Sequence, residues 1–380
     1  MSSSLVGLLL HFYQPPTQDP GTVRKIDSES YNPVFRLLRD SGSKVTVNVN
    51  YSLTEQLALH CPETLELIKA CSGCEFTQSG AFHPLLPLIH PEEVERQLMI
   101  NGEGNRRLIP RFGEPGGVFP PEMALDGRTA SILAGLGYRW TITDDVPWVF
   151  TGREAPAAWI PVYKGIKVLL RSNFWSNFIS FHGDDGGLIA RRLIKEMRGW
   201  MGNQDSYIVV AMDGETFGHH RPGAVEGFLK PFLGELSECD GASLATVGEI
   251  AERFPGREEE VPAGSWSTSP SDMERGVPFP LWDDPANLDH QYLRLLQNTV
   301  LERARSCDSA NVARLADEML YSCPFWWASS GRYCALQVRR GISAILGTAL
   351  AISREYSDRT FMDTVMTLAG GIPAMIRKDD

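Results

Sequence analysis

The strongest constraint on the fold is an alternation of short apolar runs with helix-like segments over the first two thirds of the chain. Seven runs rich in β-forming residues recur, at 5–11, 44–50, 74–80, 117–122, 138–145, 167–173 and 207–213. Helical patterns lie between most of them, at 32–42, 90–109, 126–137 and 186–200. Strands that alternate with helices predict a parallel sheet, and continuously apolar strands predict that both of its faces are covered. Seven such units favour a barrel, with the functional site at the C-terminal ends of its strands.

The character of the sequence changes near residue 256. Residues 257–285 are rich in Pro, Gly, Ser and charge, which is typical of a long excursion. Four consecutive helices are then expected, at 287–305, 309–322, 335–353 and 358–371. We therefore predict an α/β fold with an incomplete TIM-like (β/α)7 barrel over residues 1–260. Residues 261–380 are predicted to form a linker excursion and a C-terminal helical region packed against the barrel.

Charge and cysteine usage narrow the class of protein. The net charge of -11 disfavours a nucleic acid or an anionic membrane as partner, whereas a neutral sugar would be indifferent to it. The N-terminal apolar run is short and lacks a basic flank, so we interpret it as a first strand and expect a cytoplasmic protein. Seven cysteines, an odd count, fit reduced thiols. Cys71 and Cys74 form a CxxC pair without a second pair, so no metal or other cofactor is expected.

Acids, amides and histidines gather where several predicted strands end. Each such residue alone is ordinary, because a histidine or an acid after a strand is often a packing or capping residue. Their convergence at one end of a barrel is what favours a site there. The candidates that follow the first, third, fourth and seventh strands are His11, Gln14, Glu75, His83, Glu122, Asp213 and Glu215.

Glu122 and Asp213 are the candidate catalytic pair. Two carboxylates across a cleft are the minimum equipment for cleavage of a glycosidic bond. Pro120 and Pro121 fix the backbone before Glu122 and would present its carboxylate rigidly. On the residues alone, a stiff loop in which Glu122 caps the next helix is an equal alternative. If Asp213 moves the proton, its pKa should be raised by burial or by a neighbouring carboxylate, for which Glu215 is the candidate.

The remaining candidates are expected to contact substrate. His11, Gln14, Glu75 and His83 could exchange hydrogen bonds with sugar hydroxyls. Among nine tryptophans, Trp266 and Trp282 lie in loop-like stretches and could stack on sugar faces, although most tryptophans are packing residues.

Five segments in order carry a family resemblance: HFYQPP, GCEFTQSGAFHPLLPL, GVFPPEMALD, VVAMDGETFGHH and TVGEIAERFP. Together they resemble the five ordered motifs of glycoside hydrolase family 57, and GSW at 264–266 resembles a further landmark. The resemblance implies an incomplete (β/α)7 barrel and retaining chemistry on α-linked glucans, of the amylase, glucanotransferase or branching type. It also implies that Glu122 is the nucleophile and Asp213 the general acid/base. In the first motif, Phe12 and Tyr13 stand where the family often has a further histidine.

Two other functions are compatible with these residues. A metal-dependent carbohydrate deacetylase on a related barrel could use His11, His83, Asp213 and His219 as ligands, although it would not need Glu122. A non-catalytic sugar-binding relative is the other alternative. His219 and His220 receive no assigned role. The choice between water and a sugar hydroxyl as acceptor, the substrate's length and linkage, and the oligomeric state stay open.

Overall fold

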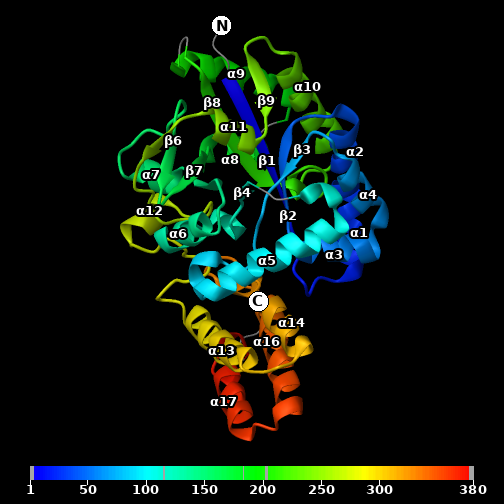
Figure 1. Cartoon of the computed structure of the whole chain (residues 1–380), viewed down its shortest axis with the longest axis vertical. Helices are drawn as coiled ribbons and strands as arrows, with labels where there is room; N and C mark the ends of the chain where they lie inside the picture. Colours follow the sequence, from blue (N-terminus) through cyan, green and yellow to red (C-terminus); the bar gives the residue numbers. More distant parts are fainter. Residues whose placement is uncertain (1–3, 114–115, 183, 202–203, 376–380) are drawn as a thin grey trace.

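A computed structural model of the chain describes residues 4–113, 116–182, 184–201 and 204–375 (Figure 1). Each of the seven predicted runs contains a strand. These strands are β1 (Ser4–Phe12), β2 (Val45–Val49), β3 (Cys74–Phe76), β4 (Gly117–Val118), β5 (Trp140–Asp144), β7 (Ile166–Arg171) and β8 (Ser206–Asp213).

The sheet is mostly parallel, as the alternation predicts. β1 lies between β8 on one side and β2 with the later strand β9 on the other. The order continues from β2 to β3, and on the other side from β8 through β7 and β5 to β4. A parallel bridge between Gln78, just after β3, and Val118 of β4 links these two ends.

Three strands were not predicted from the sequence: β6 (Ile160–Tyr163), β9 (Ala242–Ala245) and β10 (Gly256–Glu258). β6 forms an antiparallel hairpin with β7, and β10 pairs with β6. These strands are three or four residues long, and all of β10 is exposed, so none carries the continuous apolar pattern of a buried strand.

Helices surround the sheet, and their ends follow the predicted signals. Gly42 ends α2 with φ 61°, and the Asp126 side chain accepts a hydrogen bond from the Thr129 N–H at the start of α6. The helices up to residue 253 are α1 (Pro20–Ile26), α2 (Asn32–Ser41), α3 (Tyr51–His60), α4 (Pro62–Ala70), α5 (Pro91–Leu108), α6 (Gly127–Gly135), α7 (Val146–Phe150), α8 (Asn173–Phe181), α9 (Gly186–Met201), α10 (Lys230–Glu238) and α11 (Val247–Arg253), with π-helical turns at Asp27–Tyr31 and Val225–Leu229.

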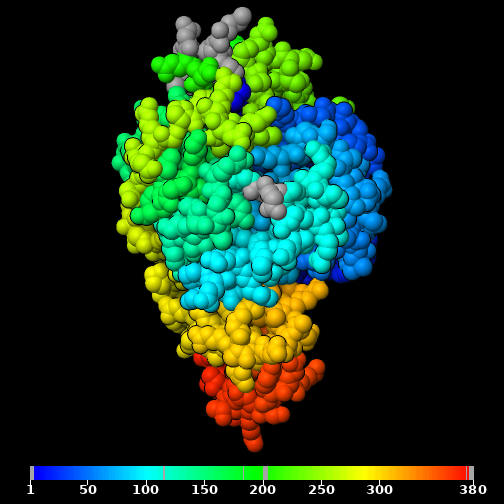
Figure 2. All heavy atoms as spheres, in the orientation of Figure 1, coloured from blue at the N-terminus to red at the C-terminus, as the bar shows by residue number. Residues whose placement is uncertain are grey.

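The C-terminal region is helical, as predicted, and the part of it from residue 288 onward packs at one end of the sheet domain, below α5 in Figures 1 and 2. Arg305 bonds Glu93 of α5 through two hydrogen bonds, and Arg96 of α5 bonds both carboxylate oxygens of Asp317 at 2.7 Å. One apolar cluster contains residues from α5, α6 and these helices. The C-terminal helices are α12 (Pro270–Glu274), α13 (Leu288–Arg305), α14 (Ala310–Glu318), α15 (Cys323–Ala328), α16 (Ala335–Tyr356) and α17 (Arg359–Gly370).

Alternate residues of each strand face different apolar layers, because the side-chain period of a strand is two. On β1, Val6, Leu8 and Leu10 belong to a cluster with residues of α1 to α4 and α8 to α10. Leu5 and Leu9 instead belong to a second cluster that contains alternate residues of β8 and β5, Leu169 of β7 and the apolar face of α11. This second layer is the inner face of the strands.

Within the described part of the chain, none of the helices has the length and apolar character needed to cross a membrane.

Candidate active site

The inner face of the strands changes from apolar to polar at its C-terminal end. His11 continues the inner row of β1 beyond Leu9, and Asp213 continues the inner row of β8 beyond Ala211. His11 and Asp213 are also register partners on the two adjacent strands. The period of two and the parallel register together therefore bring these two predicted residues side by side. Asn48, Asp144 and Arg171 end the inner rows of β2, β5 and β7 in the same way.

Glu122 reaches this cluster from the turn Pro121–Met123 that follows β4. Its backbone is left-handed, with φ 61°, a conformation that costs a residue with a Cβ free energy. Trp266 holds it there by donating its main-chain N–H to Glu122 O at 3.2 Å and its Nε1–H to Glu122 Oε2 at 2.7 Å. Burial raises the Glu122 pKa to about 8, with a further rise from Asp213, and the Trp266 bond opposes these effects. The two predicted carboxyl groups therefore share one electrostatic environment.

Asp213 lies next to a buried cation that the sequence did not point to. Burial raises the pKa of Asp213 to about 6, and the Arg171 guanidinium opposes that rise. Arg171 donates to Asp144 Oδ2 at 2.5 Å, to Ala211 O at 2.8 Å and to Asn177 Oδ1 at 2.9 Å. Because these bonds fix the guanidinium, its distance from Asp213 is set by the fold.

Glu215 is a buried carboxyl beside the partly buried pair. Tyr31 Oη–H donates to Glu215 Oε1, and Gln14 Nε2–H donates to both Tyr31 Oη at 2.8 Å and Glu215 Oε1 at 3.4 Å. Burial, and secondly the charge of Asp213, raises the pKa of Glu215 to about 8. Gln14 and Glu215 are thus in contact, as expected of two residues of one site. Each of them already has hydrogen-bond partners within the protein.

His11 and His83 form a stacked pair whose ring nitrogens all have protein partners. His11 Nδ1 lies 2.6 Å from Asn48 Oδ1, the two Nε2 atoms lie 3.2 Å apart, and His83 Nδ1 lies 3.2 Å from Ser322 Oγ. The Tyr13 ring stacks on His83 with centroids 4.0 Å apart. This arrangement differs from the expected hydrogen bonds to sugar hydroxyls, because each ring nitrogen is occupied.

Two predicted substrate contacts are placed away from this cluster. Glu75 lies on β3, two residues before the level of the strand ends at which the cluster lies. There its Oε2 accepts hydrogen bonds from Thr46 Oγ1 at 2.8 Å and from the Gly248 N–H of α11 at 3.0 Å. Its carboxylate therefore joins α11 to the strands. Trp282 was expected to be available to a sugar, but it is 1% exposed and packs in the apolar cluster shared with the C-terminal helices. That expectation is wrong, because proline-rich loop composition does not reveal whether a loop tryptophan folds inward.

One of the four candidate metal ligands of the deacetylase alternative, His219, has a partner outside the cluster of His11, His83 and Asp213. His219 Nδ1 lies 2.6 Å from Glu29 Oε2, on the outer side of the turn after β8. His220, the next residue, is exposed. Over the residues the structure describes, no three His, Cys, Asp or Glu side chains are grouped so that they could hold a metal. The buried thiols of Cys71 and Cys74 lie in the apolar layer beneath the helices.

Several site residues were missed because their partners lie far away in the sequence. Ser322 and Cys323 come from the C-terminal region, where Cys323 Sγ lies 3.6 Å from Tyr13 Oη. Nothing in the helical pattern of 309–322 marks them. Arg171 and Asn48 could have been found, because both are polar residues at inner positions at the end of otherwise apolar strands.

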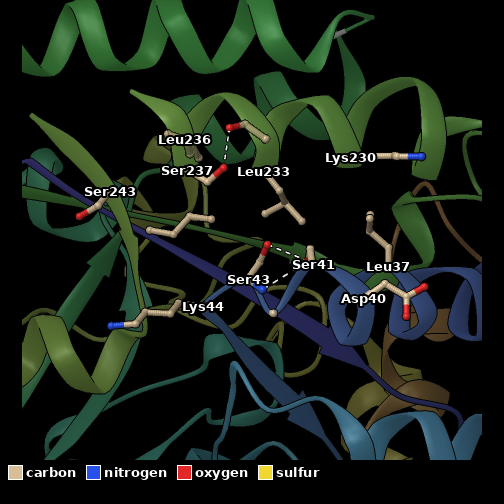
Figure 3. Close-up of a pocket in the computed structure, with 13 residues that line it drawn as sticks. Leu37, Asp40, Ser41, Ser43, Lys44, Lys230, Leu233, Leu236, Ser237 and Ser243 are labelled. Carbon is tan, nitrogen blue, oxygen red and sulfur yellow. Dashed lines mark hydrogen bonds between the residues drawn. The ribbon is translucent and has the colours of Figure 1, made fainter. Parts of the chain in front are cut away.

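A surface pocket of about 540 Å³ lies elsewhere, between the end of α2 and α10, beside residue 44 that precedes β2 (Figure 3). Leucine and serine side chains line it. Both of its lysines are ion-paired, Lys44 with Glu249 at 2.5 Å and Lys230 with Glu226 at 2.7 Å. None of the carboxyl groups described above lines this pocket, so we assign the candidate site to the C-terminal ends of the strands.

The part of the chain that carries most of these side chains matches a known family. The family model described as glycosyl hydrolase family 57 matches residues 18–262, more than half of the chain. The chain belongs to glycosyl hydrolase family 57. No sequence among the curated proteins matches it.

Solved structures of this family share the fold. The 4-α-glucanotransferase of Thermococcus litoralis is similar with a TM-score of 0.76 and 17% identity, over 92% of this chain and 60% of that one. This chain thus spans about 60% of the glucanotransferase's length. The GH57-type branching enzyme of Pyrococcus horikoshii gives 0.73 and 16%, over 99% and 96% of the two chains. The α-amylase AmyC of Thermotoga maritima gives 0.68 and 14%, over 100% of both.

Proposed function

We propose that this member of glycosyl hydrolase family 57 cleaves or transfers α-linked glucans with retention of configuration, using Glu122 as nucleophile and Asp213 as general acid/base. The observation that carries the proposal is the arrangement of two partly buried carboxyl groups at the same end of the strands, one held rigidly by Trp266 and one beside a fixed arginine. The names of the similar structures, a glucanotransferase, a branching enzyme and an amylase, support an α-glucan as substrate.

The scaffold of this site is, in our proposal, an incomplete (β/α)7 barrel. Seven parallel strands follow one another from β3 to β4, and the bridge between Gln78 and Val118 joins the first to the last. Residues 1–260 would supply both catalytic carboxyl groups. Residues 261–380 would complete the site through Trp266 and Ser322.

In the first step, Glu122 attacks the anomeric carbon. Its Oε2 is held by the indole of Trp266, which leaves Oε1 for bond formation. A donor aimed at the carboxylate favours its ionised form and orients it before substrate arrives. As the C–O bond to the leaving group breaks, Asp213 gives its proton to the glycosidic oxygen. The products of this step are a glycosyl ester on Glu122 and an Asp213 carboxylate.

In the second step, Asp213 accepts a proton from water or from a sugar hydroxyl that attacks the same carbon. The ester breaks, and Glu122 leaves as a carboxylate. Two inversions give net retention, and the proton returns to Asp213, so the cycle closes without another reactant.

The cycle needs Glu122 ionised and Asp213 protonated. The two pKa values favour the opposite in the free protein, because that of Glu122, about 8, lies above that of Asp213, about 6. Bound substrate reverses this preference. The glycosidic oxygen accepts a hydrogen bond from protonated Asp213, and positive charge developing at the anomeric carbon stabilises ionised Glu122. Glu215, also raised to about 8, disfavours a negative charge on Asp213 whenever it is itself ionised. The role of Glu215 would be to raise the pKa of Asp213.

The decisive experiment incubates wild type, Glu122→Gln and Asp213→Asn with maltooligosaccharides, amylose and glycogen. Products are resolved by length and branching, and the anomer formed first is followed by proton NMR. Exposed Glu226→Gln is the matched control and should keep wild-type turnover. We expect both site variants to lose at least about 100-fold in turnover, and wild type to release the α-anomer first. Wild-type turnover in either variant, or initial release of the β-anomer, would refute the proposed roles.

A further inference from the structure

The histidine pair occupies a position that the proposed reaction does not explain. His83 Nδ1 lies 3.9 Å from Glu122 Oε1, close enough for an ion pair if His83 gained a proton. His83 also has a left-handed backbone, with φ 61°, like Glu122 itself. A strained residue whose side chain lies beside a nucleophile must be held by its surroundings.

Ser322 holds His83 through two hydrogen bonds. The Ser322 main-chain N–H donates to His83 O at 3.1 Å, and Ser322 Oγ lies 3.2 Å from His83 Nδ1. Both His83 and Ser322 are buried. The hydroxyl therefore covers the ring nitrogen that lies towards Glu122.

The direction of the hydrogen bonds can be followed from the other end. Asn48 Nδ2–H donates to Thr77 Oγ1 at 2.9 Å, so Asn48 Oδ1 is the atom that lies 2.6 Å from His11 Nδ1. A carbonyl oxygen only accepts, so His11 Nδ1 carries the proton. In a neutral ring, His11 Nε2 is then an acceptor. It receives its bond from the Nε2–H of His83, which leaves His83 Nδ1 as an acceptor for the Ser322 hydroxyl.

We propose that Ser322 is a positioning residue for Glu122: its hydroxyl begins a one-way hydrogen-bond chain, Ser322–His83–His11–Asn48, that keeps both imidazole rings neutral and prevents His83 from pairing with the nucleophile. The chain crosses from the C-terminal region to β2. The effect of this hydrogen-bond chain on catalysis rests on the proposed role of Glu122, whereas the proton positions along it do not.

The surroundings of the rings agree with neutrality. Burial lowers the pKa of His11 to about 4, and burial and then His11 lower that of His83. The groups that face His83 are Glu122, His11, the stacked Tyr13 ring and, through Tyr13, the Cys323 thiol. Burial raises the pKa of Tyr13 well above its usual value and that of Cys323 to about 12, so neither brings a charge to the rings at neutral pH.

The direct test is long-range proton–nitrogen NMR of the whole protein labelled with ¹⁵N-histidine. Wild type should show the Nδ1–H tautomer for His11 and the Nε2–H tautomer for His83, both neutral from pH 8 to pH 5. Reversed tautomers, or a His83 that titrates in this range, would overturn the proposal. This readout needs no variant and no substrate.

Ser322→Ala removes the hydroxyl but keeps the main-chain bond to His83. We expect the His83 pKa to rise and pairing of His83 with Glu122 to become more favourable, because its Nδ1 loses its donor while Glu122 Oε1 stays 3.9 Å away. Turnover at pH 6 should fall about tenfold with KM nearly unchanged, and the acid limb of the pH profile should move to higher pH. Ser322→Thr, which keeps the hydroxyl, should restore the tautomers and the profile.

The outcomes separate this inference from the proposed function. If Ser322→Ala leaves the His83 tautomer and titration unchanged, the hydrogen-bond chain is refuted. If the tautomers change but the pH profile does not, the positioning role is refuted, while the loss of turnover in Glu122→Gln tests the nucleophile independently. Should Ser322→Ala fail to fold, Asn48→Leu interrupts the chain at its other end, and the His11 tautomer must then change.

Discussion

Trp266 and Glu122 are joined by two hydrogen bonds, one from main chain to main chain at 3.2 Å and one from the indole to the carboxylate at 2.7 Å. Ser322 and His83 are joined in the same way. Both receiving residues have φ 61°, and both donors lie in the last third of the chain. The C-terminal region therefore holds two strained residues of the site that follow strands β3 and β4.

Trp266→Phe should reduce kcat by about 10- to 100-fold, because it removes the donor that favours ionised Glu122. The acid limb of the pH profile should shift upward as the pKa of Glu122 rises. The matched control is Trp282→Phe, whose indole nitrogen is buried without a hydrogen-bond partner in the structure. If both variants lose the same activity, the indole bond to Glu122 has no special role.

Arg171→Met should raise the pKa of Asp213 above about 6, because it removes the cation that opposes the effect of burial. Asp213 would then stay protonated to higher pH, so the alkaline limb of kcat should move upward. The variant also leaves the buried Asp144 carboxylate unpaired, at a cost of about 3–5 kcal/mol in the free energy of unfolding. Urea unfolding should show that adding Asp144→Asn recovers part of this loss. An unchanged alkaline limb would contradict the assigned effect of Arg171.

Glu215→Gln should make stability less sensitive to pH. The folded-state pKa of Glu215 is raised to about 8, so the folded protein binds a proton that the unfolded chain releases near pH 4.5. Its contribution to stability is therefore present at low pH and is lost as pH rises towards 8, by on the order of 1.4 kcal/mol per pH unit at most. Urea unfolding of wild type and variant at pH 5, 6, 7 and 8 measures the difference. The free energy of unfolding of the variant should rise relative to that of wild type as pH rises. A difference between the two that stays constant with pH would refute the raised pKa.

Asp317→Asn should loosen the C-terminal region from α5. Asp317 is nearly buried and accepts from both Arg96 and Arg305, so losing its charge leaves two half-covered guanidinium groups less well paired. We expect a loss of about 1–3 kcal/mol in the free energy of unfolding. Activity should fall only near the new unfolding temperature, which thermal denaturation and assays at several temperatures can compare. Loss of activity well below that temperature would show that the ion pair also shapes the site.

The elements that the sequence predicts well are those with a continuous local pattern. β1, β2 and β8 are rich in apolar β-forming residues, and α2 and α6 carry clear end signals, so each forms near its predicted position. Helix α3 was not singled out because its apolar residues do not favour one face strongly. The short strands β6, β9 and β10 depend on neighbours that are distant in sequence, and no local signal marks them.

The same distinction applies to the site. His11, Asp213 and Glu122 could be located because each follows a strand, and all three reach one cluster. Ser322 could not, because its role depends on a contact with residue 83, more than two hundred positions away. Trp282 and Glu75 show the opposite failure: their residue types suit sugar binding, but burial among apolar neighbours or hydrogen bonds to α11 determine what they do.

The central place of β1 has a consequence for synthesis of the chain. β1 is made long before β8, yet its longest pairing is with β8, from Ser4 opposite Ser206 to His11 opposite Asp213. Until the ribosome has released residue 213, one edge of this strand, which is entirely buried in the folded protein, has no native neighbour. Pairings this distant in sequence form slowly and leave exposed edges that favour aggregation. The nascent protein should therefore depend on chaperones until β8 is made, and slower translation before residue 206 would prolong that dependence.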